Sequence, residues 1–247
     1  NQIAASSNFR NSRNPFSMVQ NIEPKSNAER WVGDLYLEIT PFKDLTLRSS
    51  VSMDMSNNRD KLFKYAYVYS DYDRSDKNFV SNSMARYNTL TIDNILTYAK
   101  DFGRHSFSAM VGQTAEEFNY TFIGGSGASI LNPTPNNWFI SQSTEDKSYT
   151  GDGASRTRMF SLLSRLHYGF DNKYMITMNF RADASSKFPE NLWGYFPSTA
   201  VAWRISEESW MKEVPNLDFM KVRAGWGQIG NDKINSDSFI LKMFNAG

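Results

Sequence analysis

The side chains that most often perform catalysis are few in this sequence, and they stand apart from one another. The chain has no cysteine and only two histidines, His105 and His167. A thiol nucleophile is therefore excluded, and each imidazole stands singly on an expected strand. Asp183 and Glu190 could form the carboxylate pair of a glycosidase, but such pairs arise by chance among 26 acidic residues. These observations predict a protein that is not an enzyme.

Two further motifs begin like ligand-binding loops and then depart from them. Asp71-x-Asp73-x-Ser75 starts like a calcium loop but lacks glycine at the sixth position and glutamate at the twelfth. The glycine-rich stretch at 124–127 lacks the Lys-Ser/Thr of a phosphate loop. We therefore expect no metal and no cofactor. An irregular calcium site in a loop, at 71–75 or 232–237, stays open as an alternative.

Aromatic rings in expected loops offer a different chemistry, because a ring face can pack against the apolar face of a sugar. Trp138 and Phe139 lie in one such loop, and Trp193 and Tyr195 lie in another. These four residues are the candidates for substrate binding, and the tyrosines between 65 and 72 are further ones. A rigid rim loop with interfacial aromatics is the competing interpretation of residues 186–198, and it is the one we favour.

The elements that must position these side chains are strands. Between Tyr174 and Ala184 apolar residues occupy every second position, and mostly polar residues lie between them. Successive side chains of a strand point to opposite faces, so this segment predicts a strand with one apolar and one polar face. Similar alternation recurs near residues 31–40, 45–55, 89–98, 106–112, 160–170, 200–205 and 220–227.

The connections between the predicted strands fall into two classes. Short turns are expected at 43–44, 101–104, 171–172 and 207–217, and long loops at 57–86, 119–155, 186–195 and from 232 onward. The pattern predicts about eight strands of roughly 10 to 14 residues, and a tilted strand needs about 9–11 residues to cross a membrane. Short turns at one end and long loops at the other are typical of a transmembrane β-barrel. The predicted fold is all-β and antiparallel.

Composition agrees with this interpretation and leaves two alternatives. The chain has 18 Phe, 12 Tyr and 6 Trp, yet its net charge is only +1, so nothing argues for nucleic acid. No segment approaches the run of about 18 apolar residues of a membrane-spanning helix. A soluble carbohydrate-binding β-sandwich would also alternate, but with strands of about five or six residues. A small, self-contained outer-membrane barrel with a structural or adhesive role is the second alternative.

Three blocks of the sequence resemble the SusC/RagA family of TonB-dependent outer-membrane transporters. They are residues 181–198, with the sequence RADASSKFPENLWGYFPS, residues 202–208, with AWRISEE, and residues 221–232, with KVRAGWGQIGND. They follow the family's order. The resemblance implies short periplasmic turns, long extracellular loops and about eight strands of a 22-stranded barrel. It also implies that residues 1–247 are a partial barrel domain, without the plug and without either end of the barrel.

The family resemblance implies a function as well. Its members import oligosaccharides, and sometimes peptides, through a plugged barrel in the outer membrane of Gram-negative bacteria. The expected partners are a SusD-like surface lipoprotein, the TonB complex acting through the plug region, the substrate and outer-membrane lipid. No nucleic acid and no covalent chemistry are expected.

The polar faces of the predicted strands carry cations that we expect to line the lumen or face the plug. These residues are Arg48, Arg165, Arg181, Lys221 and Arg223. A charge on the lipid face costs about 2–4 kcal/mol at the midplane, whereas a lumen-facing charge costs little. The assignment predicts that Val222→Arg impairs barrel assembly and that Arg223→Ala does not.

Overall fold

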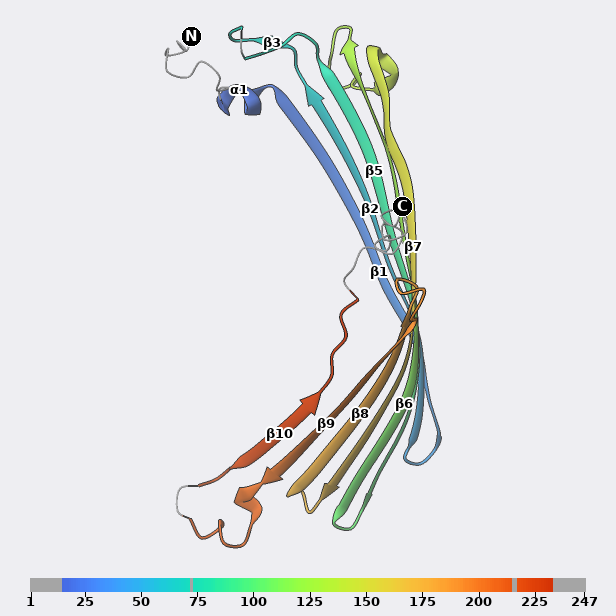
Figure 1. The fold of residues 1–247 in the computed structure, drawn as a ribbon, viewed down its shortest axis with the longest axis vertical. Helices are drawn as coiled ribbons and strands as arrows, with labels where there is room; N and C mark the ends of the chain where they lie inside the picture. Colours follow the sequence, from blue (N-terminus) through green and yellow to red (C-terminus); the bar gives the residue numbers. More distant parts are fainter. Residues whose placement is uncertain (1–14, 72, 215–216, 233–247) are drawn as a thin grey trace, which may run out of the picture. The chain divides into compact units, whose positions relative to one another are not determined.

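The computed structural model describes residues 15–71, 73–214 and 217–232, and they form an antiparallel meander (Figure 1). The strands of the main sheet follow one another in chain order. They are β1 (Ile22–Phe42), β2 (Leu45–Lys64), β5 (Phe79–Phe102), β6 (His105–Ile130), β7 (Ser143–Phe170), β8 (Tyr174–Ser185), β9 (Trp193–Arg204) and β10 (Lys221–Gly227). The all-β, antiparallel prediction is confirmed.

Smaller elements lie between the strands. A helix α1 (Pro15–Gln20) precedes β1, and β3 (Tyr67–Val68) pairs with β4 (Arg74–Ser75) in a separate ribbon. The 3-10 helices are η2 (Ile140–Gln142) and η3 (Ile205–Glu207). Among the described helices, none has the length and apolar content that would let it cross a membrane.

The chain divides into two compact units, which are described separately. The first contains residues 1–31, 55–88 and 119–155, and the second contains residues 32–54, 89–118 and 156–247. Each long strand from β1 to β7 contributes residues to both units. Strands β8, β9 and β10 belong wholly to the second unit.

The second unit contains the tight turns that the sequence predicts. Asp44, Gly103, Asp171 and Asn172 all have positive φ, and Asp, Asn and Gly adopt this left-handed conformation most readily. Such residues suit two-residue hairpin connections, because their twist matches that of the flanking strands. Arg104 and Asp171, from neighbouring turns, form a two-pronged ion pair. The turns predicted at 43–44, 101–104 and 171–172 are therefore confirmed.

Strands β7 to β10 pair in a register that separates their two faces. Leu162 lies opposite Ala182, and Leu166 lies opposite Met178. Ile176 lies opposite Val201, which in turn lies opposite Ala224. These rows make one apolar face, as the alternation predicts. Because side chains alternate along each strand, the residues between them make the opposite face.

The first unit has its own small core. Phe63, Val80, Ile130 and Trp138 are all buried. The Phe63 and Trp138 rings stack with their centroids 4.5 Å apart, and Tyr65 packs edge-on against Phe63. The segment between β6 and β7, residues 131–142, brings Trp138 to this core.

Two of the predicted long loops are wrong in extent. Much of 57–86 and 119–155 is strand, because β2 runs to Lys64, β5 begins at Phe79, β6 runs to Ile130 and β7 begins at Ser143. Strands β1, β2, β5, β6 and β7 have 21, 20, 24, 26 and 28 residues, well beyond the predicted 10 to 14. Backbone pairing continues where the side chains of both faces are polar.

The sheet also bears on the alternative folds. The described strands form one eight-stranded sheet and one two-stranded ribbon, and not the two stacked sheets of a β-sandwich. Within that part of the chain, β1 and β10 are the end strands of the sheet order.

Candidate functional site

The polar face of β7, β8 and β9 carries a ladder of hydrogen bonds. Arg165 Nε donates to Asn179 Oδ1 at 2.7 Å, and Asn179 Nδ2 donates to Ser198 Oγ at 3.1 Å. One rung away, His167 Nδ1 lies 2.9 Å from Thr177 Oγ1. Residues directly opposite one another on one face are the pairs that stabilise a sheet. The ladder therefore fixes the guanidinium of Arg165 on this face.

A second cationic group lies further along the same face. Arg181 Nε donates to both carboxylate oxygens of Asp183, at 2.7 and 2.8 Å, and Arg181 Nη2 lies 3.3 Å from the buried hydroxyl of Ser161. The Arg181 side chain is 48% exposed. The ion pair is thus a mild constraint that orients the arginine and leaves it accessible to a ligand.

The three remaining cations expected in the lumen have different surroundings. Lys221 Nζ lies 3.4 Å from the Met175 sulfur. Arg223 is exposed and lies opposite Ala202. On β2, the Arg48 guanidinium covers the Tyr36 ring at 4.3 Å from its centroid. In the β8–β10 register, Lys221 and Arg223 lie on the face opposite that of Val222 and Trp203.

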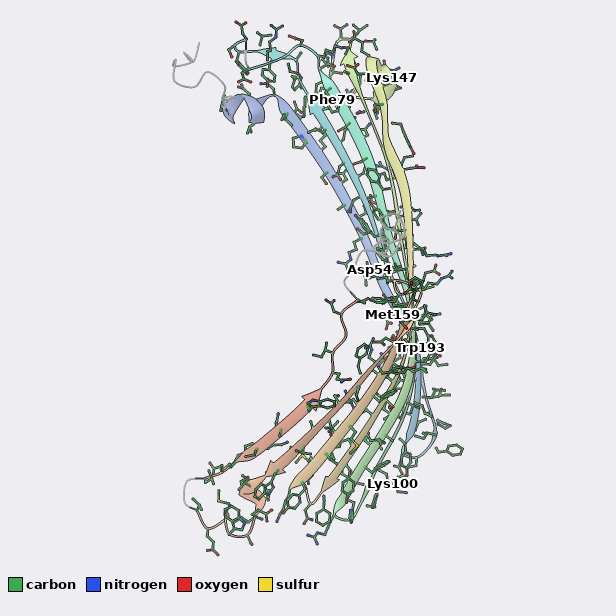
Figure 2. All side chains as sticks on the ribbon, viewed as in Figure 1. Asp54, Phe79, Lys100, Lys147, Met159 and Trp193 are labelled. Atoms are coloured by element: carbon green, nitrogen blue, oxygen red, sulfur yellow. The ribbon has the colours of Figure 1, made fainter. Side chains whose placement is uncertain are left out.

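A cavity of about 590 Å³ opens where the polar face meets the segment between β8 and β9. Its walls include Arg181, Asp183, Phe188 and Phe196, with Gln228 from the segment that follows β10. Met159 and Trp193, also in its lining, are labelled in Figure 2. A concave site that combines apolar walls with a few polar groups has the general character of a ligand pocket.

One side of this cavity is closed by residues 228–232. The Gln228 amide donates to the Pro197 carbonyl at 3.0 Å. Lys187 Nζ donates to the Asp232 carbonyl at 3.0 Å and lies 3.6 Å from its carboxylate. Gly230 approaches the Phe196 ring so closely that a Cβ at this position would lie 2.3 Å from it. A larger residue at this position would therefore displace the Phe196 ring.

Two of the four aromatic candidates lie on the apolar face. Trp193 lies opposite Ala184, and Tyr195 lies opposite Ala182. Trp193 packs edge-on against Phe160, and Tyr195 stacks with Phe180. The position of these side chains agrees with the interfacial interpretation, which was the favoured one. Phe196, another ring of the 186–198 segment, lies opposite Arg181 on the polar face.

A second aromatic row crosses the other end of the apolar face. Phe170 stacks with Tyr174, and Tyr174 stacks with Trp203. Glu208 ties the row together, because its Oε1 accepts hydrogen bonds from the Tyr174 hydroxyl at 2.6 Å and from Trp203 Nε1 at 3.1 Å. These bonds, the Tyr174 hydroxyl first, hold the pKa of the Glu208 carboxyl below its usual range.

The two rows have the spacing of a membrane. Along β8 they are ten residue steps apart, since Tyr174 lies opposite Trp203 and Ala184 lies opposite Trp193. At about 3.3 Å per residue and a tilt of about 35–45°, this gives roughly 23–27 Å. Outer-membrane barrels carry an apolar band of about 25 Å between two aromatic girdles.

The other two aromatic candidates differ sharply in exposure. Trp138 is fully buried against Phe63, so its assignment as a substrate-binding ring is wrong: no ring face is open to a ligand. Phe139 is 49% exposed and lies under Lys61 Nζ, 4.5 Å from the ring centroid. Of the four candidates, Phe139 is the one that lies outside both the core and the apolar face.

The described residues form no cluster of three or more acidic or histidine side chains able to hold a metal. Asp73 Oδ1 accepts a hydrogen bond from Tyr67 at 3.2 Å, and the Asp73 amide is 3.0 Å from Ser70 Oγ. These bonds give Asp73 a structural role in the β3–β4 ribbon. Most of the second candidate calcium segment, residues 233–237, lies outside the described residues.

The sequence analysis does not single out Glu117, because its partners lie on another strand. Glu117 on β6 accepts hydrogen bonds from Arg156 at 2.7 Å and from Arg158 at 2.8 Å, both on β7. The two arginines are two residues apart, so they share a face of the strand. That spacing is the one sequence signal that could have marked them as a pair.

Comparison with known proteins gives clear relatives. No family model matches the chain. TonB-dependent receptor SusC of Bacteroides thetaiotaomicron is 28% identical over 242 residues, which are 96% of this chain and 23% of that protein. TonB-dependent receptor P39 of Formosa agariphila is 33% identical over 162 residues, covering 63% of this chain and 15% of that receptor.

Solved structures show the same fold. The structure of the RagAB peptide transporter matches with a TM-score of 0.79 at 22% identity, over 89% of this chain and 24% of that one. The RagAB peptide importer in its 'open-open' state matches with a TM-score of 0.78. The chain thus spans less than a quarter of the length of the relatives and structures named here.

Proposed function

Because this chain belongs to the SusC/RagA family of TonB-dependent receptors, we propose that it forms part of the barrel wall of an outer-membrane nutrient importer. The host is a Gram-negative bacterium. In this proposal residues 1–247 all belong to the barrel domain. The plug and the other barrel strands would then belong to the rest of the full-length protein.

The observation that carries the proposal is the two-faced sheet of β7 to β10. Its apolar face ends in two aromatic rows at the spacing of a bilayer, and its other face carries the Arg165 and Arg181 networks. A soluble sheet would cover its apolar face with a second layer. Here Leu166, Met178 and Val201 are nearly half exposed among the described residues, which suits contact with lipid.

We assign the polar face to the lumen. Arg48, Arg165, Arg181, Lys221 and Arg223 would then line the transport path or contact the plug. The cavity beside Phe196 and Arg181 combines ring faces with charged groups, a set that suits either an oligosaccharide or a peptide. One of the solved structures is that of a peptide importer, and the family resemblance implies oligosaccharides, so the proposal keeps both substrate classes.

The partners follow from the proposed assembly. A SusD-like surface lipoprotein would cover the extracellular mouth, where we place residues 65–78 and 131–142. TonB would supply energy through the plug of the full-length receptor. The chain would perform no covalent chemistry on the substrate, and its relatives are receptors and transporters.

Uptake by the full-length receptor tests this function. A strain lacking the receptor gene would be complemented with wild-type receptor or with Arg181→Ala, and accumulation of labelled oligosaccharides and peptides would be measured with and without TonB. We expect TonB-dependent accumulation of one substrate class. The importer function would be ruled out if uptake of both substrate classes were independent of TonB and equal to that of the deletion strain.

A further inference from the structure

We propose that the first unit binds an anionic sugar in a cationic pocket with aromatic walls, a site separate from the import path. The pocket has a volume of about 600 Å³. Its lining includes two cations, two aromatic rings, an amide and a thioether: Arg59, Lys61, Phe139, Tyr149, Asn82 and Met84. They come from β2, β5, β7 and the segment between β6 and β7.

Within the described residues, the two cations of this pocket and the neighbouring Lys25 have no acidic partner. Lys61 Nζ lies over the Phe139 ring, and Lys25 Nζ lies 4.8 Å from the centroid of the Trp138 ring. Neither lysine, nor Arg59, forms a salt bridge with any carboxylate in the described part of the chain. Burial, and then the positive charge of Lys25, lower the pKa of Lys61. An anion placed here would relieve this crowding.

The remaining wall groups suit a sugar better than a bare ion. Phe139 and Tyr149 are 49% and 63% exposed, so each has ring surface open to a sugar ring. The Asn82 side-chain oxygen has no hydrogen-bond partner among the described residues. By turning, this amide can accept a hydrogen bond from a sugar hydroxyl.

The core of the unit holds these groups in place. Phe139 directly follows Trp138, which is fully buried, and Lys61 lies two residues before Phe63, which stacks on Trp138. The ring and the ammonium group are therefore positioned by the same buried contact. Little ordering is left for a ligand to impose, and preorganisation of this kind strengthens binding.

The faces of β2 favour one source for the sugar. Along this uninterrupted strand, Arg59 and Lys61 lie an even number of residues from the apolar Val51 and Met53, so they share a face with them. They lie on the face opposite that of Arg48, which contacts Tyr36. In a barrel the apolar face, that of Val51 and Met53, points outward. We therefore infer that the ligand is the phosphorylated sugar head group of an outer-leaflet glycolipid, rather than a solute in the lumen.

Binding to the full-length receptor in detergent tests the site. Purified lipopolysaccharide that retains its phosphates would be titrated against wild type and against the double variant R59Q/K61Q. We expect at least 10-fold weaker binding by the double variant, with a flatter dependence on salt. The matched control is Lys64→Gln, a lysine on the opposite face of the same strand; it should bind like wild type.

Two comparisons decide the ligand class. Dephosphorylated lipopolysaccharide should bind the wild type as weakly as intact lipopolysaccharide binds the double variant. Equal binding of both preparations, or equal binding by R59Q/K61Q and K64Q, overturns the proposal. Short galacturonate oligomers are the second probe, and tighter binding of these than of lipopolysaccharide would overturn the membrane source. Substrate uptake is measured separately, so failure of this site leaves the importer function untouched.

Discussion

Replacing Leu166 by arginine is expected to destabilise the barrel far more than replacing Val222 by arginine, although both side chains lie on the apolar face. The difference is one of depth. Leu166 lies opposite Met178, four residues from Tyr174 along β8. Val222 lies opposite Trp203, in the aromatic row itself.

The depth of each position sets the magnitude. Four residues at about 3.3 Å and a tilt of about 40° place Leu166 roughly 10 Å from the row of Tyr174 and Trp203. The proposed band is about 25 Å thick, so Leu166 lies within a few ångströms of its centre. Arginine costs about 2–4 kcal/mol at the midplane and about 0–1 kcal/mol near an interface. The register thus refines the expectation from sequence. Val222 lies near an interface, so Val222→Arg tests only weakly which face of β10 contacts lipid.

The assay is reversible unfolding of the full-length receptor in lipid vesicles, followed by tryptophan fluorescence and by heat-modifiable mobility on gels. We expect Leu166→Arg to lower the free energy of unfolding by about 2–4 kcal/mol and Val222→Arg by about 1 kcal/mol or less. His167→Arg is the matched control. It introduces the same side chain one residue away, on the polar face beside Thr177, and should cost little.

Two results would refute the reasoning. If Leu166→Arg and His167→Arg cost the same, the apolar face of β7 does not contact hydrocarbon. If Val222→Arg costs as much as Leu166→Arg, the Tyr174–Trp203 row does not mark an interface. If none of the three variants assembles in the outer membrane, the comparison would be repeated with glutamine at the same positions, because glutamine keeps the polarity but removes the charge.

Three further outcomes are expected. Lys187→Ala should release residues 228–232 from the cavity, seen as faster amide exchange at Gly230 without loss of the barrel. The pKa of Glu208 is lowered in the folded protein, so its contribution to stability is present above its unfolded pKa of about 4.3 and is lost as pH falls through the lower, folded value. The melting temperature of Glu208→Gln should therefore fall less than that of wild type as the pH is lowered below about 4.3. Trp138→Ala should destabilise the first unit by about 3–5 kcal/mol, measured as protease sensitivity of residues 131–142, whereas Phe139→Ala, at an exposed ring, should not.

The two faces of β8 could be predicted from the sequence because they meet different surroundings. Met178 and Phe180 lie on one face, and Asn179 and Arg181 lie on the other, as the alternation indicates. The turn at Asp171 was equally predictable, because its residue types favour the backbone conformation that a tight hairpin requires. In each case a local preference and the tertiary structure agree.

The ends of the long strands could not be predicted from the sequence, because their side chains do not alternate between apolar and polar. Residues 57–61 of β2, Asn-Asn-Arg-Asp-Lys, are polar on both faces and read as a loop. Strand pairing depends on backbone hydrogen bonds, which polar side chains do not interrupt. Alternation marks a strand only where one of its faces is apolar. The predicted strand lengths were therefore closer to the apolar stretches than to the strands themselves.

The surroundings of the four aromatic candidates could not be predicted for a related reason, since ring type alone does not say which way a ring points. Trp193 and Phe196 are three residues apart, so in a continuous strand they lie on opposite faces. The loop before β9 hides which residues of this strand share a face. Only the register with Ala184 and Arg181 shows that Trp193 lies on the apolar face and Phe196 on the polar face. Trp138 is a stricter case: its burial depends on Phe63, which is 75 residues away in the chain. Aromatic residues near strand ends can therefore be ranked as ligand contacts only after pairing has assigned each ring to a face.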